Sequence, residues 1–351
     1  MLTSLVGSEM CIRDRYLLGE TPEIKKLFTC CGFNSIGIAS SGGAGRVTAE
    51  WMINGHINED LFSLDIKRFQ KFHSSKKFIM ERVTETLGDL YGMHWPFKQH
   101  KTSRNQIVLP YQEELKKLGA CFGTSGGFER PMWYALKGEK ADYNYSFGYQ
   151  NWYPSAEFET KNARENVGLF ELSPFSKFDL EGQNVHEELQ KICTANIKDI
   201  EGRATYTQML NEDGGIETDV TVTCLKKNHF RVIGPAATRE HDKFHIKKHI
   251  SEEVNFKDVT EDLTCLGLYG PNSRKLLSNI SNDDFTNEGI KFSHGKFVTI
   301  DGVKVWAQRL SYVGEIGFEL YTNIDESKKL FLAIIKEGKN HGLSLCGAHA
   351  M

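Results

Sequence analysis

Apolar and polar residues alternate most regularly just after a pair of glycines in the middle of the chain. In the segment Tyr206 to Val222, YTQMLNEDGGIETDVTV, Gly214 and Gly215 predict a hairpin turn that leads into a strand. One face of this strand carries Ile216, Thr218, Val220 and Val222, and the other carries Glu217, Asp219 and Thr221. Asp219 is therefore presented by a rigid element on the face opposite Val220, which is one way to deliver a carboxylate into a cleft.

A second stretch, Arg309 to Tyr321 or RLSYVGEIGFELY, has the same character. Tyr312 and Glu319 flank Gly314 and Gly317, and these glycines predict either a turn or a close approach of the backbone to a flat ligand. Spacing alone also fits two surface hairpins that carry solvated acids.

A third glycine-rich segment lies near the start of the chain. Ser40 to Gly45 predicts a polar turn, and Arg46 to Asn54 then predicts a helix that Gly55 caps. A turn that leads into a helix N-terminus presents free N–H groups to a cofactor edge, although a plain turn is the alternative. The segment is not a complete dinucleotide-binding fingerprint, because the G-x-G-x-x-G spacing is absent.

Helical and strand patterns are mixed over the rest of the chain, which predicts an α+β fold. Helices are expected in KKFIMERVTETLGDLY, in YQEELKKLGA, over Lys161–Val167 and Asn184–Cys193, from Ser273, and over Asp325–Gly338. Strands are expected over Phe170–Leu180, Phe230–Ile233, Thr264–Tyr269 and Phe297–Arg309. Gly126 and Gly127 predict a turn beside the aromatic anchors Phe128, Trp133 and Tyr134, and Lys137–Asn151 is expected to be a connecting loop.

Composition excludes several classes of protein. The chain has 351 residues, 40% hydrophobic and 25% charged, with a net charge of -3 and no basic stripe, which argues against nucleic-acid binding. No apolar run reaches the length of a membrane span. The eight cysteines lack C-x-x-C spacing and predict reduced, buried thiols of an intracellular protein.

His241, His245 and His249 recur at i, i+4 and i+8, a spacing that can hold a metal on one helical face. Lys243, Lys247 and Lys248 crowd the same helix with positive charge. A solvated helix face is therefore the expectation, and no metal site is predicted.

Several segments, in order along the chain, resemble the dimethylglycine and sarcosine dehydrogenase family of flavin-dependent amine oxidoreductases. They are LGETPEIKKLF, GFNSIGIASSGGAGRVTAEWMINGH, LDIKRF, GACFGTSGGFERPMWY, NARENVGLFELSPFSK, GRATYTQMLNEDGGIETDVTV, LYGPNSRKLL and RLSYVGEIGFELY. The resemblance implies the end of a flavin domain over residues 16–72, a central linker domain over 73–135 and a truncated aminomethyltransferase-like (GcvT-type) folate-binding domain over 150–351. Residues 1–15, MLTSLVGSEMCIRDR, fit none of these and are interpreted as a sequence artefact.

The resemblance also implies roles for single residues. Asp219 matches the family's essential acid beside the folate, and Tyr206, Tyr312 and Glu319 match the cavity that holds the pterin. Gly42, Gly43 and Gly45 match the turn that approaches the flavin ring. The implied cofactors are FAD and tetrahydrofolate, although the family's flavin-binding Rossmann segment has no counterpart here, and its module continues beyond Met351. We therefore expect a fragment that is inactive by itself.

The function implied for the full protein is oxidative demethylation of an N-methyl amine, with transfer of the one-carbon unit to tetrahydrofolate. An electron-transfer flavoprotein is a candidate partner, and the expected location is the bacterial cytoplasm or the mitochondrial matrix. Two alternatives stay open: a folate-dependent aminomethyl or methyltransferase without redox activity, and a non-catalytic protein like the regulatory subunit of pyruvate dehydrogenase phosphatase. The sequence does not name the amine.

Overall fold

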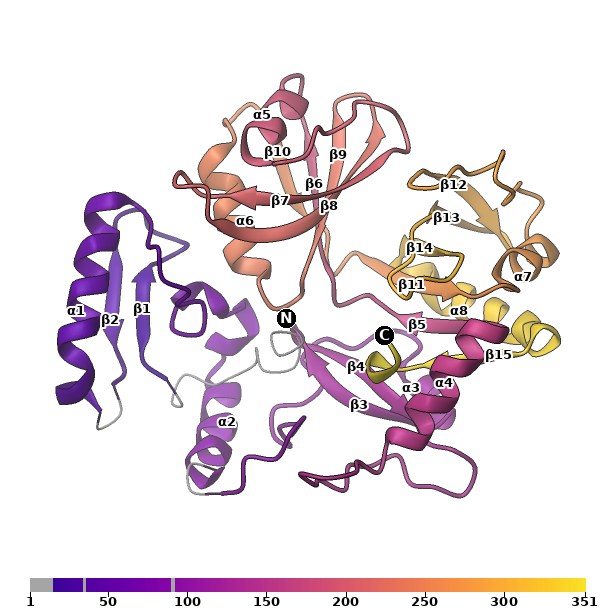
Figure 1. The fold of residues 1–351 in the computed structure, drawn as a ribbon, viewed down its shortest axis with the longest axis horizontal. Coiled ribbons are helices and arrows are strands. Elements are labelled where there is room, and N and C mark those ends of the chain that lie inside the picture. The colour runs from indigo at the N-terminus through magenta and orange to yellow at the C-terminus, as the bar shows by residue number, and fades with distance from the viewer. Residues whose placement is uncertain (1–14, 34–35, 90–91) are drawn as a thin grey trace.

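The computed structural model describes residues 15–33, 36–89 and 92–351 of the chain (Figure 1). Helices and strands are mixed along its length and nearly all strand pairs are antiparallel, so the predicted α+β class is confirmed. The described strands form a five-stranded sheet, a six-stranded sheet and two hairpins. The proposed artefact at the N-terminus lies, except for Arg15, outside the described residues.

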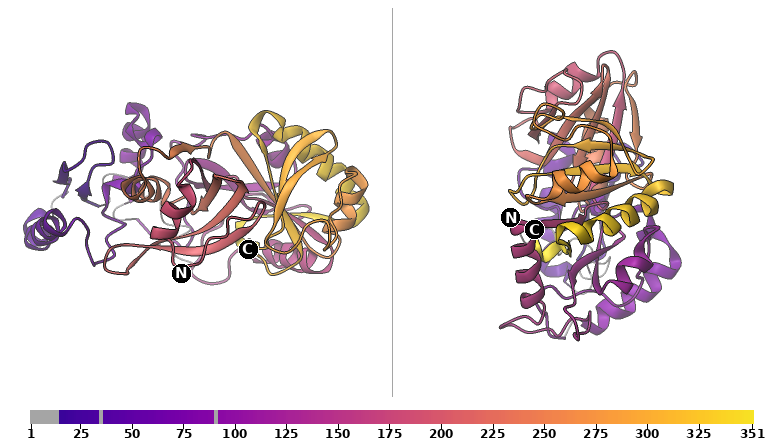
Figure 2. Two further views of the ribbon diagram at one scale, coloured as in Figure 1. Left: turned by 90° about the horizontal axis from the view of Figure 1, so that it is seen from above. Right: turned by 90° about the vertical axis from the view of Figure 1, so that its right-hand side faces the viewer.

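The N-terminal part is a small module of one hairpin and one long helix. β1 (Leu17–Glu20) pairs antiparallel with β2 (Phe28–Cys31), and α1 (Gly37–Asn54) packs against both strands. The short 3-10 helices η2 (Ile66–Arg68) and η3 (Lys71–Ser74) then lead to α2 (Lys76–Asp89). Figure 2, left, shows this indigo module at one end of the long axis of the molecule. α2 corresponds to the helix predicted in KKFIMERVTETLGDLY, whose last two residues, 90 and 91, lie outside the described residues.

The predicted turn over Ser40–Gly45 is wrong, because α1 begins earlier and includes all of it. An exposed glycine inside a helix costs about 1 kcal/mol relative to alanine. Burial of Val47 and Trp51 on the same helix offsets this cost. The predicted cap is confirmed: Gly55 is left-handed with φ 78°, and its N–H donates to the carbonyl of Trp51 at 2.9 Å.

The middle of the chain is a second hairpin. α3 (Gln112–Lys117) precedes β3 (Ala120–Ser125) and β4 (Phe128–Tyr134), and Gly126 and Gly127 form the predicted turn with positive φ. The three aromatic anchors are buried, and Phe128 and Tyr134 share a core with the six-stranded sheet. Residues 137–151 form a loop without helix or strand, as expected.

The five-stranded sheet is a fully antiparallel layer with its helices on one face. Its strands are β6 (Ser176–Glu181), β7 (Ala204–Leu210), β8 (Ile216–Lys226), β9 (His229–Gly234) and β10 (Asn255–Asp258), in the order β10-β6-β9-β8-β7. Val220, Val222 and Phe230 form its core with Leu189 of α5 (Val185–Ile192) and Ile246 of α6 (Arg239–His249). The other face of β8 carries Asp219 and looks away from this core.

The six-stranded sheet combines a local meander with one parallel strand. It has the order β12-β13-β14-β11-β5-β15, and only β15 runs parallel to its neighbour, β5. The strands are β5 (Val167–Glu171), β11 (Leu263–Tyr269), β12 (Gly295–Ile300), β13 (Val303–Gln308), β14 (Gly317–Asn323) and β15 (Leu343–Cys346). The accompanying helices are α4 (Tyr153–Glu165), α7 (Ser273–Ile280), α8 (Ile324–Gly338), η4 (Lys339–His341) and η5 (Ala348–Ala350).

Two predicted boundaries in this region are wrong. The helix expected over Lys161–Val167 starts at Tyr153 and ends at Glu165, and Val167 opens β5. The strand expected over Phe170–Leu180 is two strands in different sheets, β5 and β6, because the chain turns between them at Pro174, which has no N–H to donate to a ladder.

The two large sheets meet face to face, with β8 and β9 opposite β13 and β14. Backbone hydrogen bonds join their edges, from Gly295 N–H to the Gly202 carbonyl and from Ala204 N–H to the Ser293 carbonyl, each 2.8 Å. Gly202 has φ 81°, and a Cβ there would lie 2.3 Å from the carbonyl oxygen of Gly295. Glycine is therefore required where the sheets approach.

The cysteines in the described residues are free thiols, as expected. The expectation that they are buried is wrong for Cys30 and Cys31, which are exposed at the end of the edge strand β2. In the portion that the structure describes, no helix has both the length and the apolar character needed to cross a bilayer.

Candidate functional site

The β7–β8 hairpin presents the predicted acid to the surface in a fixed position. The hydroxyl of Tyr206 on β7 donates a hydrogen bond to Oδ2 of Asp219 on β8 at 2.9 Å. Thr218 and Val220, on either side of Asp219, are buried, whereas Asp219 and Tyr206 are exposed. The hydrogen bond to Asp219 raises the pKa of Tyr206, so the tyrosine stays a donor to this carboxylate.

Glu319 lies on β14, on the face turned toward the five-stranded sheet. The hydroxyl of Tyr321 donates to its Oε2 at 2.6 Å. Burial raises the pKa of Glu319, although the hydrogen bond from Tyr321 opposes this effect. Glu319 is thus a partly buried acceptor rather than a solvated surface acid.

Tyr312 lies in the bend before β14, with its side chain 58% exposed and its ring 6.4 Å from that of Phe175. Gly314 has φ 80° and makes the predicted turn. Gly317 has a different role, because a Cβ there would lie 2.2 Å from the Leu268 carbonyl oxygen. Its close approach is to strand β11, and not to a flat ligand.

A small cavity between the two sheets connects these elements. It contains about 10 Å³ of space, enough for a single water molecule. Its walls come from β8 and β9 on one side and from β13 and β14 on the other: Thr221, Thr223, Leu225, Arg231, Ile233, Trp306, Gln308, Leu310, Glu319 and Tyr321. Asp219 precedes Thr221 on the same face of β8, so Asp219 and its partner Tyr206 lie next to the part of β8 that lines the cavity, whereas Glu319 lines the cavity itself.

Sequence reasoning missed Gln308, which also lines this cavity and is 2% exposed. The signal was present in the alternation of β13, where Val303, Val305 and Ala307 face one core and Trp306 and Gln308 face the other way. A buried amide on that face marks it as polar.

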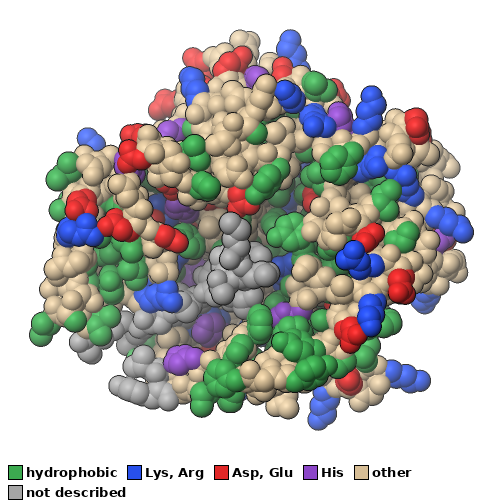
Figure 3. Space-filling model, viewed as in Figure 1, with side chains coloured by type: hydrophobic (Ala, Val, Ile, Leu, Met, Phe, Trp, Pro, Cys, Tyr) green, Lys and Arg blue, Asp and Glu red, His purple; other side chains and the backbone are tan. Residues whose placement is uncertain are grey.

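The three glycines assigned to flavin lie on α1. Gly42, Gly43 and Gly45 are exposed, and among the described residues no atom outside the neighbouring helix backbone lies within 4 Å of a Cβ built on any of them. Ile38 and Met52 follow the same helix face as Gly42 and Gly45, and they are 98% and 55% exposed. Figure 3 shows hydrophobic side chains on this module. The face leaves room for a flat group or another domain to approach the backbone.

The expectation that the three histidines lie on a solvated helix face is wrong. His245 is buried and His241 is mostly covered, because α6 packs between the sheet and the N-terminal module. Nε2 of His241 lies 3.0 Å from Glu217 and its Nδ1 lies 3.3 Å from Asp242. Burial opposes the imidazolium, but the hydrogen bonds to Asp242 and Glu217 outweigh it and raise the pKa of His241 to about 10.

Glu217, His241 and His245 line a cavity of about 430 Å³ between the N-terminal module and α6. His56 from the module pairs with Asp213 of the β7–β8 turn at 3.3 Å, and Gln70 Nε2 donates to the Ala236 carbonyl at 3.0 Å. Lys248 of the histidine helix also donates to the Gly55 carbonyl at 3.3 Å, and α6 packs against η2, so this helix helps to join the N-terminal module to the five-stranded sheet.

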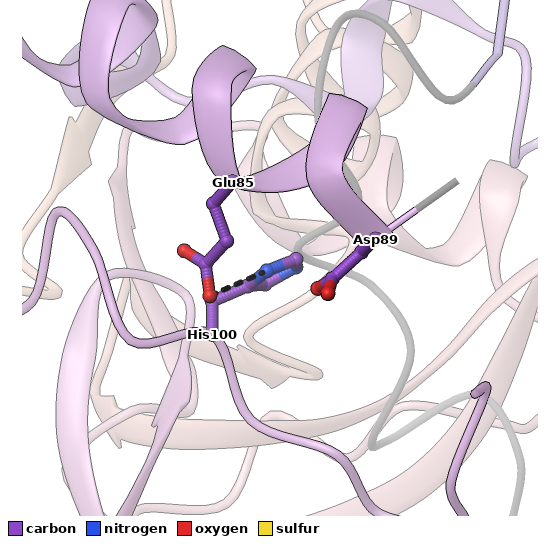
Figure 4. A group of neighbouring side chains, drawn as sticks. All are labelled: Glu85, Asp89 and His100. Carbon is purple, nitrogen blue, oxygen red and sulfur yellow. Dashed lines mark ion pairs between the residues drawn. The ribbon is translucent and has the colours of Figure 1, made fainter. Parts of the chain in front are cut away.

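A different group has the composition of a metal site. Glu85, Asp89 and His100 are the only described residues whose potential ligand atoms, in a set of three or more, lie within 4.8 Å of one another (Figure 4). Glu85 already accepts hydrogen bonds from the N–H groups of Lys101 and Thr102 at 2.6 and 2.9 Å, and Asp89 pairs with Lys98 at 2.7 Å. The group therefore fastens residues 98–102 to α2.

Residues 111–351 match the family model of the GCVT N-terminal domain, and residues 54–108 match that of the FAD dependent oxidoreductase central domain. The chain therefore belongs to the GCVT N-terminal domain family, here joined to an oxidoreductase central domain. The predicted resemblance to sarcosine and dimethylglycine dehydrogenases is confirmed.

Two curated relatives cover almost the whole chain. One is 4-methylaminobutanoate oxidase (formaldehyde-forming) of Paenarthrobacter nicotinovorans, 39% identical over 96% of this chain and 41% of that protein. Mitochondrial sarcosine dehydrogenase of Mus musculus is 30% identical over 99% of this chain and 42% of that protein. The chain spans about two fifths of the length of these relatives.

Among solved structures, the fold is similar to glycine cleavage system aminomethyltransferase T from Bartonella henselae. The TM-score is 0.57 at 23% identity, over 70% of this chain and 60% of that one. This likeness concerns the fold.

Proposed function

We propose that this chain is the folate-binding part, with an adjoining segment of the flavin domain, of an FAD-dependent dehydrogenase of N-methylated amines. In the whole protein, an N-methyl group loses a hydride and becomes an iminium carbon. Tetrahydrofolate bound to this chain would supply the nitrogen that takes up this carbon, with release of the demethylated amine. An electron-transfer flavoprotein is the proposed electron acceptor.

The observations that support the proposal are the hydrogen bond between Tyr206 and Asp219 on β7 and β8, and the position of Glu319 in the cavity that β8 shares with β14. Asp219 is exposed, so its free lone pairs can accept the proton that the attacking nitrogen releases. Tyr206 fixes the carboxylate in one orientation through its hydroxyl. Glu319 supplies a hydrogen-bond acceptor for the amino and ring N–H groups of the pterin, and exposed Tyr312 supplies an aromatic wall.

The chain also offers a partial flavin contact. A bound flavin would supply hydride acceptance. The residues of this chain that we assign to it are Gly42, Gly43 and Gly45, whose exposed helix face leaves the backbone open to a flat ring. We expect no tight flavin binding from this face by itself, because it contributes only one wall.

Folate binding can be tested on the chain itself. Tryptophan fluorescence titrations with tetrahydrofolate under anaerobic conditions should give saturable binding to the wild type. Glu319→Gln should weaken it, because a neutral amide replaces a charged acceptor. Glu315→Gln is the matched control, since Glu315 lies in the bend just before β14, pairs with Arg164 at 3.5 Å and is not among the residues that line the cavity.

Catalysis can be tested in the complete protein. Asp219→Asn keeps the shape of the side chain and removes the base, so we expect reduction of a dye by N-methyl amines to persist. Formation of methylene-tetrahydrofolate should fall by roughly a hundredfold, the scale of losing a general base. Equal loss of both activities would contradict the role assigned to Asp219. A transferase without redox activity or a regulatory subunit would show no amine-dependent dye reduction at all.

A further inference from the structure

Gln308 and Glu319 face each other directly across two strands. They are partners in the antiparallel register of β13 and β14, and the next pair on the same face is Trp306 with Tyr321. All four side chains line the cavity between the sheets. The pair therefore forms one continuous polar platform, flanked by two aromatic residues.

The aromatic neighbours hold both polar groups in defined orientations. Trp306 Nε1–H donates to Oε1 of Gln308 at 3.0 Å, and the Tyr321 hydroxyl donates to Oε2 of Glu319 at 2.6 Å. The amide of Gln308 cannot turn over, because its NH2 group would then face the indole N–H. Nε2 of Gln308 is thus the atom left to face another partner.

Within the described part of the chain that atom has no hydrogen-bond partner, although Gln308 is only 2% exposed. A buried donor without a partner is unfavourable, so it needs a water or a ligand acceptor. The cavity beside it has room for about one water, which a single carbonyl oxygen at the edge of a ligand can replace. It also contains the carboxylate of Glu319, whose side chain is partly exposed. The platform therefore presents a neutral donor beside a charged acceptor.

We propose that Gln308 is a specificity-determining residue that recognises the 4-oxo group of the reduced pterin beside Glu319, an inference that rests on the proposed folate binding. The recognised edge must carry hydrogen-bond donors next to an acceptor. The 2-amino and N3–H groups of a pterin are such donors, and its 4-oxo group is the adjacent acceptor. A 4-amino pterin presents a donor where Gln308 also presents a donor, so it should be rejected.

The test compares tetrahydrofolate with tetrahydroaminopterin, its 4-amino analogue, by anaerobic fluorescence titration of the full chain. The wild type should prefer tetrahydrofolate by roughly tenfold or more, the scale of a mismatched buried hydrogen bond. Gln308→Glu replaces the donor with an acceptor, so it should weaken tetrahydrofolate binding and shift the preference toward the 4-amino compound. Gln308→Met removes the donor without supplying an acceptor and should weaken tetrahydrofolate binding without that shift.

Two further measurements make the outcomes distinct. Gln106→Glu introduces the same charge at an exposed position and should leave both affinities unchanged. Thermal melts identify any variant that fails to fold, and the Met variant then carries the comparison. If the wild type binds tetrahydrofolate but both Gln308 variants keep the wild-type affinity ratio, the inference about Gln308 is wrong. If the wild type binds no tetrahydrofolate, the proposed function and this inference both fail.

Discussion

Glu159 should make the unfolding free energy of the chain depend on pH, because this carboxyl group is buried. The side chain projects from α4 and is 2% exposed, and its two oxygens accept from the N–H groups of Tyr134 and Gly347 at 2.7 and 2.8 Å. It therefore joins α4 to the central hairpin and to the segment after β15. Burial raises the pKa of Glu159 to about 7, although these two hydrogen bonds oppose the shift.

The sign of the effect follows from proton linkage. Because its pKa is higher in the folded chain than the usual 4.5, the folded state binds this proton more tightly than the unfolded state. The associated stability is fully present below about pH 4.5 and is lost as the pH rises through about 7. A displacement from 4.5 to about 7 corresponds to about 3 kcal/mol of unfolding free energy.

Urea unfolding of the wild type and Glu159→Gln across this pH range measures the effect. The difference in unfolding free energy, wild type minus variant, should decrease by about 3 kcal/mol, because other titrating groups cancel in the difference. Glu157→Gln is the control, since Glu157 lies two residues earlier on the same helix and pairs with Lys161 in solvent. A difference between wild type and Glu159→Gln that stays constant with pH would refute the reasoning.

Two further predictions concern glycines and metal. Gly317→Ala should lower stability by about 1–3 kcal/mol, because its Cβ would lie 2.2 Å from the Leu268 carbonyl oxygen. Gly88→Ala is the control, since Gly88 lies in α2 and no described atom comes within 4 Å of a Cβ built there, so this change should not lower the melting temperature. A Gly317→Ala variant that keeps the wild-type melting temperature would contradict the packing role of Gly317. Chelators should leave the melting temperature unchanged and the protein should carry no stoichiometric zinc, because Glu217 and Asp242 already engage His241. One bound ion per chain in elemental analysis would overturn this.

The sequence was most informative where chemistry and local pattern coincide. Gly214 and Gly215 predicted the β7–β8 hairpin, and simple alternation placed Asp219 on the face opposite Val220. Gly55 predicted the end of α1 for the same kind of reason, because a left-handed cap is a property of one residue and its neighbours. These features need no knowledge of the rest of the fold.

Features that depend on distant partners were not accessible in this way. Ser40–Gly45 reads locally as a turn, yet packing of Val47 and Trp51 on the hairpin extends the helix through it. The histidine helix reads as solvated because the N-terminal module that covers His245 lies far away in sequence. The pairing of Gln308 with Glu319 depends on the register of two strands, which the spacing of residues does not fix.

The division of the cavity between two sheets has a consequence for how the site forms during folding. Thr221 and Arg231 come from the neighbouring strands β8 and β9, and Gln308 and Glu319 come from β13 and β14, so each half of the cavity forms from residues close together in the chain. Such local pairs form quickly, whereas the docking of distant sheets is slow. A ligand that contacts both halves binds only the docked state. Reduced folate, the ligand proposed above, should therefore slow unfolding, because it stabilises the docked arrangement of the two sheets.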